Sequence, residues 1–295
     1  MKTVNYFLLI STITLLISCK KEIKFKGENA KSMLVLNGII ENDSIIRVAI
    51  SKSTPAIGEQ NTGSSDITSS ATLVLTDNTT AETFSSNSIN ANGFYEFGTT
   101  AKTGHSYSIS VSHPDYATIS SSMTSPENIA ITSWDTTHTT VQDYDGEVVN
   151  MKQISIKWQD PVGENKYTIK VFVVDTVSKY EALVSTHIYV DENDVTISGG
   201  QSTIFQDNSF NNTLKTLTFS FNSEYYKDLN NLNIGEKSYR VVLYNISNEV
   251  YNYITSTSKA EGNGNPFAEP VAIYSNIKNG IGIFGGVGTA VVNIK

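Results

Sequence analysis

Short runs that alternate apolar and polar residues recur along most of this chain and restrict it to β-structure. Apolar residues stand at every second position of ISIKW (154–158) and of YTIKVFV (167–173). Because side chains of a strand point alternately to its two faces, this period of two indicates strands with one buried face. Asp160 and Pro161 stand between the two runs, as expected of a turn.

The composition supports the same fold class. Ser, Thr, Asn, Val, Ile and Tyr are abundant, whereas Ala, Leu, Glu and Arg are scarce, so strand formers outweigh helix formers. Short strands separated by turn signals every 8–12 residues are typical of sandwiches. We therefore expect an all-β chain of two consecutive β-sandwich domains, immunoglobulin- or fibronectin-like, with one helix near the C-terminus.

The first sandwich is expected at 33–127. MLVLNGII and IIRVAISKS surround a short polar turn and predict a hairpin. Leu73 and Leu75 mark a further strand, and alternation in SYSISV places Tyr107 and Ile109 on one face. NGFYEF (92–97) is expected to pair with the strands of 106–123.

The second sandwich is expected at 128–295, after a boundary at Pro126. Ile154, Ile156 and Trp158 alternate inward before the Asp160 turn. This strand, which ends in Trp-x-x-Pro, resembles the B–C hairpin of fibronectin type III domains. Further strands are predicted at THIYV, DVTIS, LKTLTFSF, KSYRVVLYNI and TAVVNI.

One segment has helical spacing. Val250, Tyr253, Ile254 and Thr257 predict a helix over about 247–261, with Ser247 as its N-cap. Gly262 and Pro266 follow as stop signals.

The N-terminus predicts export and lipid attachment. Lys2 precedes the apolar YFLLISTITLLI, which is shorter than the roughly 20 residues that span a bilayer. LISC ends at Cys19 and resembles the lipobox of bacterial lipoproteins. Residues 1–18 are then a lipoprotein signal peptide, and 19–32 a tether whose lipid on Cys19 attaches the chain to a membrane. The alternative is an ordinary signal peptide with an incidental cysteine.

Cysteine content and charge exclude several functions. Cys19 is the single cysteine, so disulfides, cysteine-ligated metals and cysteine nucleophiles are excluded. The net charge of −8 argues against nucleic acid as a partner, since binding to phosphates depends on clustered Lys and Arg.

NGIGIFGGVG (279–288) contains G-x-G-x-x-G, the pattern of dinucleotide-binding loops. That pattern works where a strand feeds a glycine turn into a helix and an acidic residue follows about 20 positions later. Only ten residues follow Gly285, so neither can occur. Nucleotide binding is excluded, and we expect glycine turns or bulges that permit close packing.

No residues predict a cofactor, a metal or a catalytic site. His105, His113, His138 and His187 lack ligand spacing. Two acidic loops, at 143–147 and 191–194, carry alternate carboxylates that suit calcium or simply face solvent. Tyr225, Tyr226, Tyr251 and Tyr253 suit either sugar stacking or half-buried strand and helix positions.

Several segments together resemble the Bacteroidota lipoproteins grouped as the domain of unknown function 4249 family. Besides the lipobox at Cys19, they are MLVLNGIIENDSIIRVAIS, NGFYEF with TGHSYSISVSHPDY, QDP, IFQDNSFNN and NPFAEPVAIYSNIKNGIGIFGG. The last of these (265–286) is the most specific, and the resemblance covers nearly the whole mature chain.

The resemblance implies an outer-membrane lipoprotein that accompanies a TonB-dependent receptor in nutrient uptake. It also implies that the first sandwich is similar to carboxypeptidase-regulatory modules, and it defines no catalytic residues. We therefore expect a non-enzymatic accessory or ligand-binding protein on the periplasmic or cell-surface side of the outer membrane. The alternative is a surface glycan-binding or glycan-cleaving lipoprotein.

Overall fold

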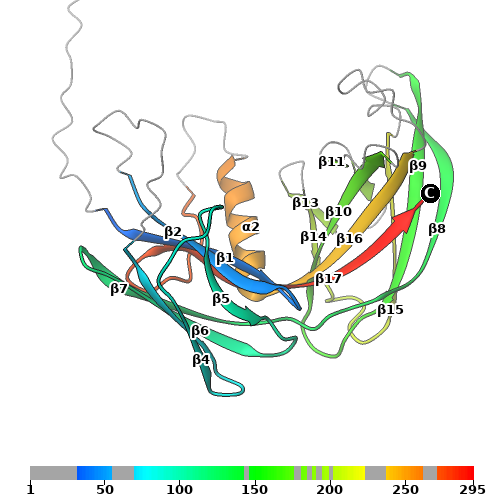
Figure 1. Cartoon of the computed structure of the whole chain (residues 1–295). Helices are drawn as coiled ribbons and strands as arrows, with labels where there is room; N and C mark the ends of the chain where they lie inside the picture. The colour runs from blue at the N-terminus through cyan, green and yellow to red at the C-terminus, as the bar shows by residue number, and fades with distance from the viewer. Residues whose placement is uncertain are drawn as a thin grey trace, which may run out of the picture. The chain divides into compact units, whose positions relative to one another are not determined.

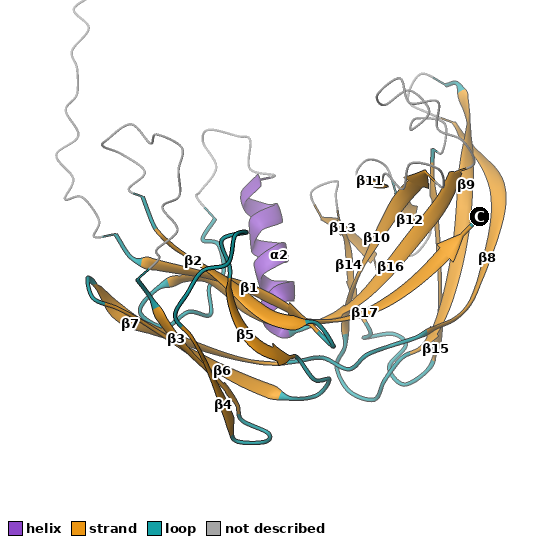
Figure 2. Ribbon diagram, in the orientation of Figure 1, coloured by secondary structure: helices purple, strands orange, loops and turns teal. Residues whose placement is uncertain are grey.

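The computed structural model describes residues 32–54, 70–142, 146–175, 181–184, 188–190, 195–198, 202–222, 237–261 and 271–295. These residues belong to one compact unit, Ser32–Thr54 with Asn61–Lys295. Its elements are β-strands and a helix, α2 (Figure 2). The described chain has the all-β, sandwich-like fold that the alternation predicts.

The strands of the N-terminal half follow the predicted runs. They are β1 (Leu34–Glu41), β2 (Ile45–Lys52), β3 (Thr72–Asp77), β4 (Glu82–Ser86), β5 (Tyr95–Thr100), β6 (Ser106–His113) and β7 (Tyr116–Thr124).

The C-terminal half holds the remaining elements. They are β8 (Ile131–Gln142), β9 (Val148–Gln159), β10 (Lys166–Asp175), β11 (Glu181–Leu183), β12 (Tyr189–Val190), β13 (Val195–Ser198), β14 (Ser202–Gln206), β15 (Leu214–Phe221), β16 (Lys237–Ile246), α2 (Asn248–Glu261) and β17 (Ile281–Ile294).

Three sheets form from these strands (Figure 1). One has nine strands in the order β13-β14-β10-β16-β17-β1-β2-β5, with β11 paired to β10. The other two have four strands each, in the orders β4-β3-β6-β7 and β12-β15-β9-β8. The nine-stranded sheet contributes to two hydrophobic cores, and each four-stranded sheet contributes to one of them.

The first core confirms the predicted inward faces and corrects one pairing. Leu73, Leu75, Tyr107 and Ile109 are buried in it. However, β5 pairs with β2 and not with β6, which lies between β3 and β7. After β5 the chain therefore passes from the nine-stranded sheet to the sheet that contains β6. The buried faces of β5 and β6 then face each other across the first core.

The second core is centred on Trp158. Ile154, Ile156 and Trp158 are fully buried, and the Trp158 ring packs at 65° on Tyr167 with 5.5 Å between centroids. The strands on either side of the Asp160 turn do not form a hairpin, because β9 and β10 belong to different sheets. The apolar residues of β9 and β10 therefore alternate because each strand turns one face to the same core, from opposite sides of it.

Strand β17 joins both cores, a role that the division at 127/128 did not include. Its first half runs parallel to β1, from Val35↔Ile281 to Glu41↔Val287. Its second half runs antiparallel to β16, from Ile246↔Val287 to Tyr239↔Ile294. In Figure 1 the red β17 lies beside the blue β1 at its beginning and beside the gold β16 at its end. Phe284 belongs to the first core and Ala290 to the second, so the C-terminal segment completes both.

The glycines of this segment permit close packing, as predicted. Gly282 has φ +117°, and a Cβ there would lie 2.0 Å from the Leu36 carbonyl oxygen. A Cβ on Gly285 would lie 2.6 Å from Val250 of α2, and one on Gly288 2.6 Å from the Glu127 carbonyl oxygen. The backbone of β17 thus passes against β1, the helix and the chain between the two cores.

Helix α2 begins as its sequence predicts. The Ser247 hydroxyl accepts hydrogen bonds from the backbone N–H of Val250 (3.5 Å) and of Gly286 (3.2 Å). Val250 is buried with Ile246 and Val287 in a small third cluster, with Ile254 packed at its edge. The predicted stop signals Gly262 and Pro266 lie outside the described residues.

Candidate binding groove

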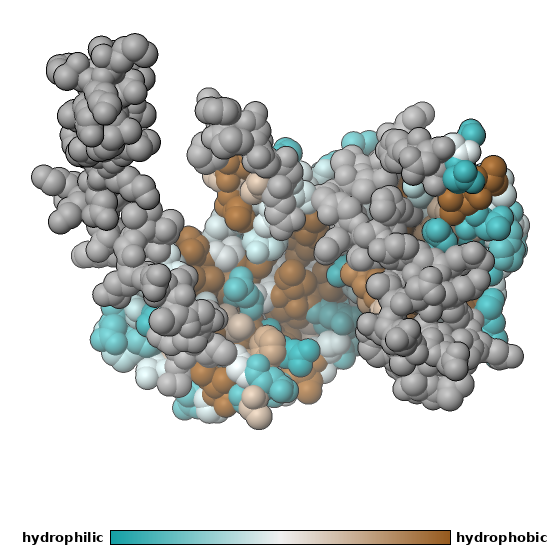
Figure 3. All heavy atoms as spheres, turned by 90° about the horizontal axis from the view of Figure 1, so that it is seen from above, coloured by the Kyte–Doolittle hydropathy of each residue, from teal (hydrophilic) through white to brown (hydrophobic). Residues whose placement is uncertain are grey.

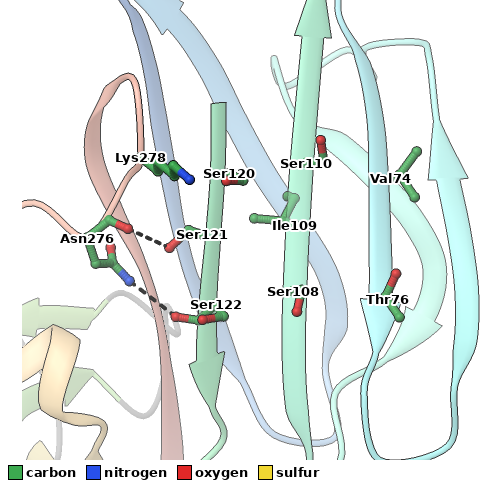
Figure 4. Close-up of a pocket in the computed structure, with 10 residues that line it drawn as sticks. All are labelled: Val74, Thr76, Ser108, Ile109, Ser110, Ser120, Ser121, Ser122, Asn276 and Lys278. Atoms are coloured by element: carbon green, nitrogen blue, oxygen red, sulfur yellow. Dashed lines mark hydrogen bonds between the residues drawn. The ribbon is translucent and has the colours of Figure 1, made fainter. Parts of the chain in front are cut away.

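A hollow lined mainly by serine and threonine side chains lies over the outward face of β3, β6 and β7. Its volume is about 520 Å³. Figure 4 shows the lining side chains, which come from these three strands and from the segment before β17. They are Val74, Thr76, Ser108, Ile109, Ser110, Ser120, Ser121, Ser122, Asn276 and Lys278.

The strand alternation produces this lining. In SYSISVS, Tyr107, Ile109 and Val111 point into the core, so the intervening serines point outward. Register then sets two rows across the strands: Thr76↔Ser108↔Ser122, in which all three side chains carry hydroxyls, and Val74↔Ser110↔Ser120, which begins with an exposed valine. The same pattern that builds the core therefore builds a hydroxyl-rich outer surface.

One wall of the groove is the segment Asn276–Lys278, which is fixed at the edge of β7. Lys278 and Ser120 exchange backbone hydrogen bonds of 2.8 and 3.3 Å, and the Ser121 hydroxyl donates to the Asn276 carbonyl oxygen at 2.9 Å (Figure 4). The Asn276 side chain in turn pairs with the backbone of Phe284, at 2.7 and 3.0 Å. The wall is thus tied to both β7 and β17.

The groove has the chemistry of a polar binding surface. Its hydroxyl groups donate and accept hydrogen bonds, and Lys278 adds a positive charge. Lys278 is exposed, and within the described ranges its ammonium group forms no ion pair. The ten lining residues include no histidine, carboxylate or aromatic ring.

A second, smaller hollow of about 350 Å³ lies at the β1–β2 turn. Ile39 and Ile45 are 50% and 56% exposed there, beside the charged Glu41, Arg47 and Glu96. On the face of the molecule seen in Figure 3, apolar surface (brown) and polar surface (teal) likewise alternate.

Several residues singled out in the sequence lie outside the described residues. They are Cys19, His187, Tyr225, Tyr226, the loop 191–194 and positions 143–145 of the other acidic loop. The remaining histidines are separate: His105 follows β5, His113 ends β6, and His138 lies on β8. In the part of the chain that the structure describes, no three His, Cys, Asp or Glu residues gather as metal ligands.

His105 forms a hydrogen bond with Asp77 that the sequence did not predict. Its Nδ1 lies 2.7 Å from Asp77 Oδ2, and Asp77 Oδ1 accepts backbone hydrogen bonds from Thr79 (2.9 Å) and Thr80 (3.3 Å). Burial alone raises the pKa of Asp77, but the hydrogen bonds from His105, Thr79 and Thr80 outweigh it and lower the pKa below 3.8. The pair fixes the β3–β4 turn.

Asp160 is a buried carboxylate with a structural role. Tyr167 donates its hydroxyl to Oδ1, and the Asn212 backbone N–H donates to Oδ2 at 2.9 Å. Burial raises the pKa of Asp160, and the nearby charge of Asp207 raises it further. Because both oxygens are occupied and the residue has no exposed surface, it closes the turn rather than facing a cleft.

Sequence reasoning missed the groove, although part of its signal was visible. The serines of SYSISVS and ATISSSMT occupy the polar positions of the alternation. Their clustering required the register of three strands, and the wall required a contact 155 positions apart in the chain.

Fold and groove together define an all-β protein with two cores, one shared sheet and a hydroxyl-lined surface. The chain belongs to the family described as Domain of unknown function (DUF4249), whose model matches residues 20–291. No curated protein matches it. Within the described ranges, no helix is long and apolar enough to cross a bilayer.

A solved structure titled "Biofilm associated protein - BSP domain" is similar at 10% sequence identity. The match covers 91% of this chain and 62% of that one, so this chain spans less than two thirds of its length. The TM-score of 0.22 is too low to support an argument from that title.

Proposed function

We propose that this chain is a non-enzymatic, lipid-anchored accessory or ligand-binding protein of the outer membrane that works with a TonB-dependent receptor. The lipobox at Cys19 supports the anchor. The resemblance of the chain to outer-membrane lipoproteins that accompany such receptors supports the partner, and the groove supports the binding role.

The observation that carries the binding role is the construction of the groove. Small hydroxyl side chains from three paired strands lie in fixed register, and a wall tied to β7 and β17 places Lys278 beside them. Groups held in place lose little conformational entropy when a ligand binds. The groove thus suits a polar ligand that carries hydrogen-bonding groups and negative charge.

Purification from detergent-solubilised outer membranes tests the anchor and the partner. The tagged chain is expected to carry lipid and to co-purify with a β-barrel receptor. A Cys19→Ala variant is expected to lose the lipid and membrane retention. Absence of any receptor in the purified material contradicts the accessory role, and lipid-independent membrane retention contradicts the anchor.

Substitution in the groove tests the binding role. Ser110→Leu places an apolar side chain among the hydroxyls and is expected to slow receptor-dependent growth on the transported nutrient. Ser85 is the matched control, because it pairs with Val74 on the same outward face but does not line the groove. Equal growth of Ser110→Leu and Ser85→Leu cells contradicts a binding role for the groove.

A surface glycan-binding role is the second candidate. Hydroxyls, the Asn276 amide and the exposed Lys278 match the hydrogen-bonding groups of sugars. A glycan array with the purified chain tests it: binding that Ser110→Leu abolishes and Ser85→Leu preserves is expected. Glycan cleavage requires two facing carboxylates, and the groove lining supplies none.

A further inference from the structure

Strand β8 is a long, open edge. It stands last in the order β12-β15-β9-β8, and eleven of its twelve residues, all but Thr132, pair with β9 from Ile131↔Trp158 to Gln142↔Val148. Among the described residues no other strand pairs with it. Most of its side chains are exposed, including Trp134 at 45%. Among the residues that the structure describes, the outer row of its backbone N–H and C=O groups therefore has no partner strand.

The other sheet edges are short or covered. β4, β5, β12 and β13 have five, six, two and four residues. The edge of β7 is covered at Ser120 and Ser121 by the segment Asn276–Lys278. Since proteins usually protect long edges from pairing, the exception at β8 indicates a use for it.

The sequence of β8 lacks most protecting features. ITSWDTTHTTVQ contains no lysine, proline or glycine, and its single carboxylate is Asp135. The only irregularity lies at its start, between Ile131 and Ser133. The stretch from Ser133 to Gln142 is thus regular, and its β-branched content favours strand pairing.

The order of residues fits a second copy of the same strand. In such a dimer the two copies of β8 are antiparallel and related by a two-fold axis perpendicular to the sheet. Residues that face each other across the axis point to the same face of the sheet, and side chains alternate between faces along a strand. The numbers of two paired residues must therefore add to an even sum. In the register centred on Thr136, Trp134 stands opposite His138 of the other copy, and Asp135 opposite Thr137. A register centred on Asp135 would place two carboxylates opposite each other, which is unfavourable.

We propose that β8 is a homodimerisation edge: two copies pair antiparallel through β8 about Thr136 and form one continuous sheet across both molecules. The two Trp134–His138 pairs add aromatic contacts on one face, one on each side of the axis. This proposal does not depend on the proposed function, since no ligand, lipid or receptor takes part in the pairing.

Cysteine cross-linking tests the register in the full chain. A Thr136→Cys variant places two thiols opposite each other at the axis, and oxidation is expected to give a covalent dimer. In a Thr140→Cys variant the thiols are eight residues apart, about 27 Å along the strands, and no dimer is expected. The unsubstituted chain controls for Cys19. Equal cross-linking of the two variants, or none in either, overturns the register.

Charge tests the edge itself. Thr136→Lys brings two ammonium groups together at the axis and is expected to raise the dissociation constant of the dimer at least tenfold, measured by analytical ultracentrifugation. Thr83→Lys makes the same change at an exposed position of β4 and is expected to leave it unchanged. Circular dichroism checks folding. An unsubstituted chain that stays monomeric, even while β8 binds a strand of another protein, overturns the proposal, as does a dimer that survives Thr136→Lys.

Discussion

The two four-stranded sheets have similar edge strands, but only one of these edges is covered by described residues. β7 and β8 are both edge strands rich in Ser and Thr, and both connect to the same nine-stranded sheet through their cores. The segment Asn276–Lys278 covers β7 and forms the groove wall, whereas no described residue covers β8. Strand composition therefore does not decide which of these edges is covered among the described residues; the path of the C-terminal segment does.

The two cores also depend differently on β17. In the first core β17 pairs in parallel with β1, and Gly282 of β17 has a positive φ there. In the second core β17 forms a regular antiparallel pair with β16. The first core is expected to be the more sensitive to changes in this segment.

Gly282→Ala is expected to have the largest effect. The new Cβ would overlap the Leu36 carbonyl oxygen and strain a φ of +117°, so the free energy of unfolding should fall by about 3 kcal/mol or more. Thermal or urea denaturation measures it. Gly98→Ala is the control, because φ is +62° there but no atom lies within 4 Å; its expected cost is about 1–2 kcal/mol. Equal costs would contradict the close approach of β17 to β1.

Asn42→Ala should be the next most damaging change, since Asn42 joins the two halves. Its side chain donates to the Pro126 carbonyl oxygen (2.8 Å) and to Asn128 Oδ1 (2.7 Å), and accepts from Ser125. We expect a loss of about 2–3 kcal/mol in urea unfolding, because three hydrogen bonds of a buried side chain are lost and the buried Ser125 hydroxyl loses its acceptor.

Asn78→Ala provides the exposed counterpart. Asn78 also donates to a side chain, Ser108 at 2.7 Å, but at the surface, where water replaces the bond. Its expected cost is below about 1 kcal/mol. A similar cost for both variants would show that the junction does not couple the halves.

The pH dependence should separate the two cores. The pKa of Asp77 lies below 3.8, so its ionised form stabilises the folded state above that pH, and the contribution is lost as the pH falls through the lowered pKa. Asp77→Asn should therefore cost about 1–2 kcal/mol at pH 6 and progressively less below pH 4, measured by urea unfolding.

Asp160 should show the opposite sign. Its pKa is raised, so the contribution from its protonated form is lost as the pH rises through that pKa. The stability of the unsubstituted chain relative to Asp160→Asn should then decline with rising pH. Parallel pH profiles for the Asp77 and Asp160 variants would contradict this contrast.

Ser121→Ala is expected to have the smallest effect and sharpens the comparison of edges. Loss of the bond to Asn276 should cost about 0.5–1 kcal/mol and speed hydrogen exchange of the Lys278 amide severalfold. Ser120→Ala, whose side chain lines the groove, should leave that exchange unchanged. Equal exchange in both variants would show that the wall is held without Ser121.

Local patterns in the sequence determined most elements. Alternation placed Tyr107, Ile109 and Trp158 in the cores, because a strand with one buried face must repeat every second residue. Ser247 and helical spacing placed α2 within a residue of its observed start. The glycine stretch lies mainly in β17, so the structure places its glycines in a strand and not in a turn that leads into a helix.

Only the tertiary structure decided how the elements meet. The pairing of β5 with β2, the parallel contact of β17 with β1 and the wall beside β7 join residues far apart in the chain. Periodicity states which face of a strand is buried but not which strand lies beside it, since many registers bury the same face. Single-chain patterning therefore fixed the strands and their inner faces, while the shared sheet, the groove and the open edge of β8 follow from long-range backbone pairing.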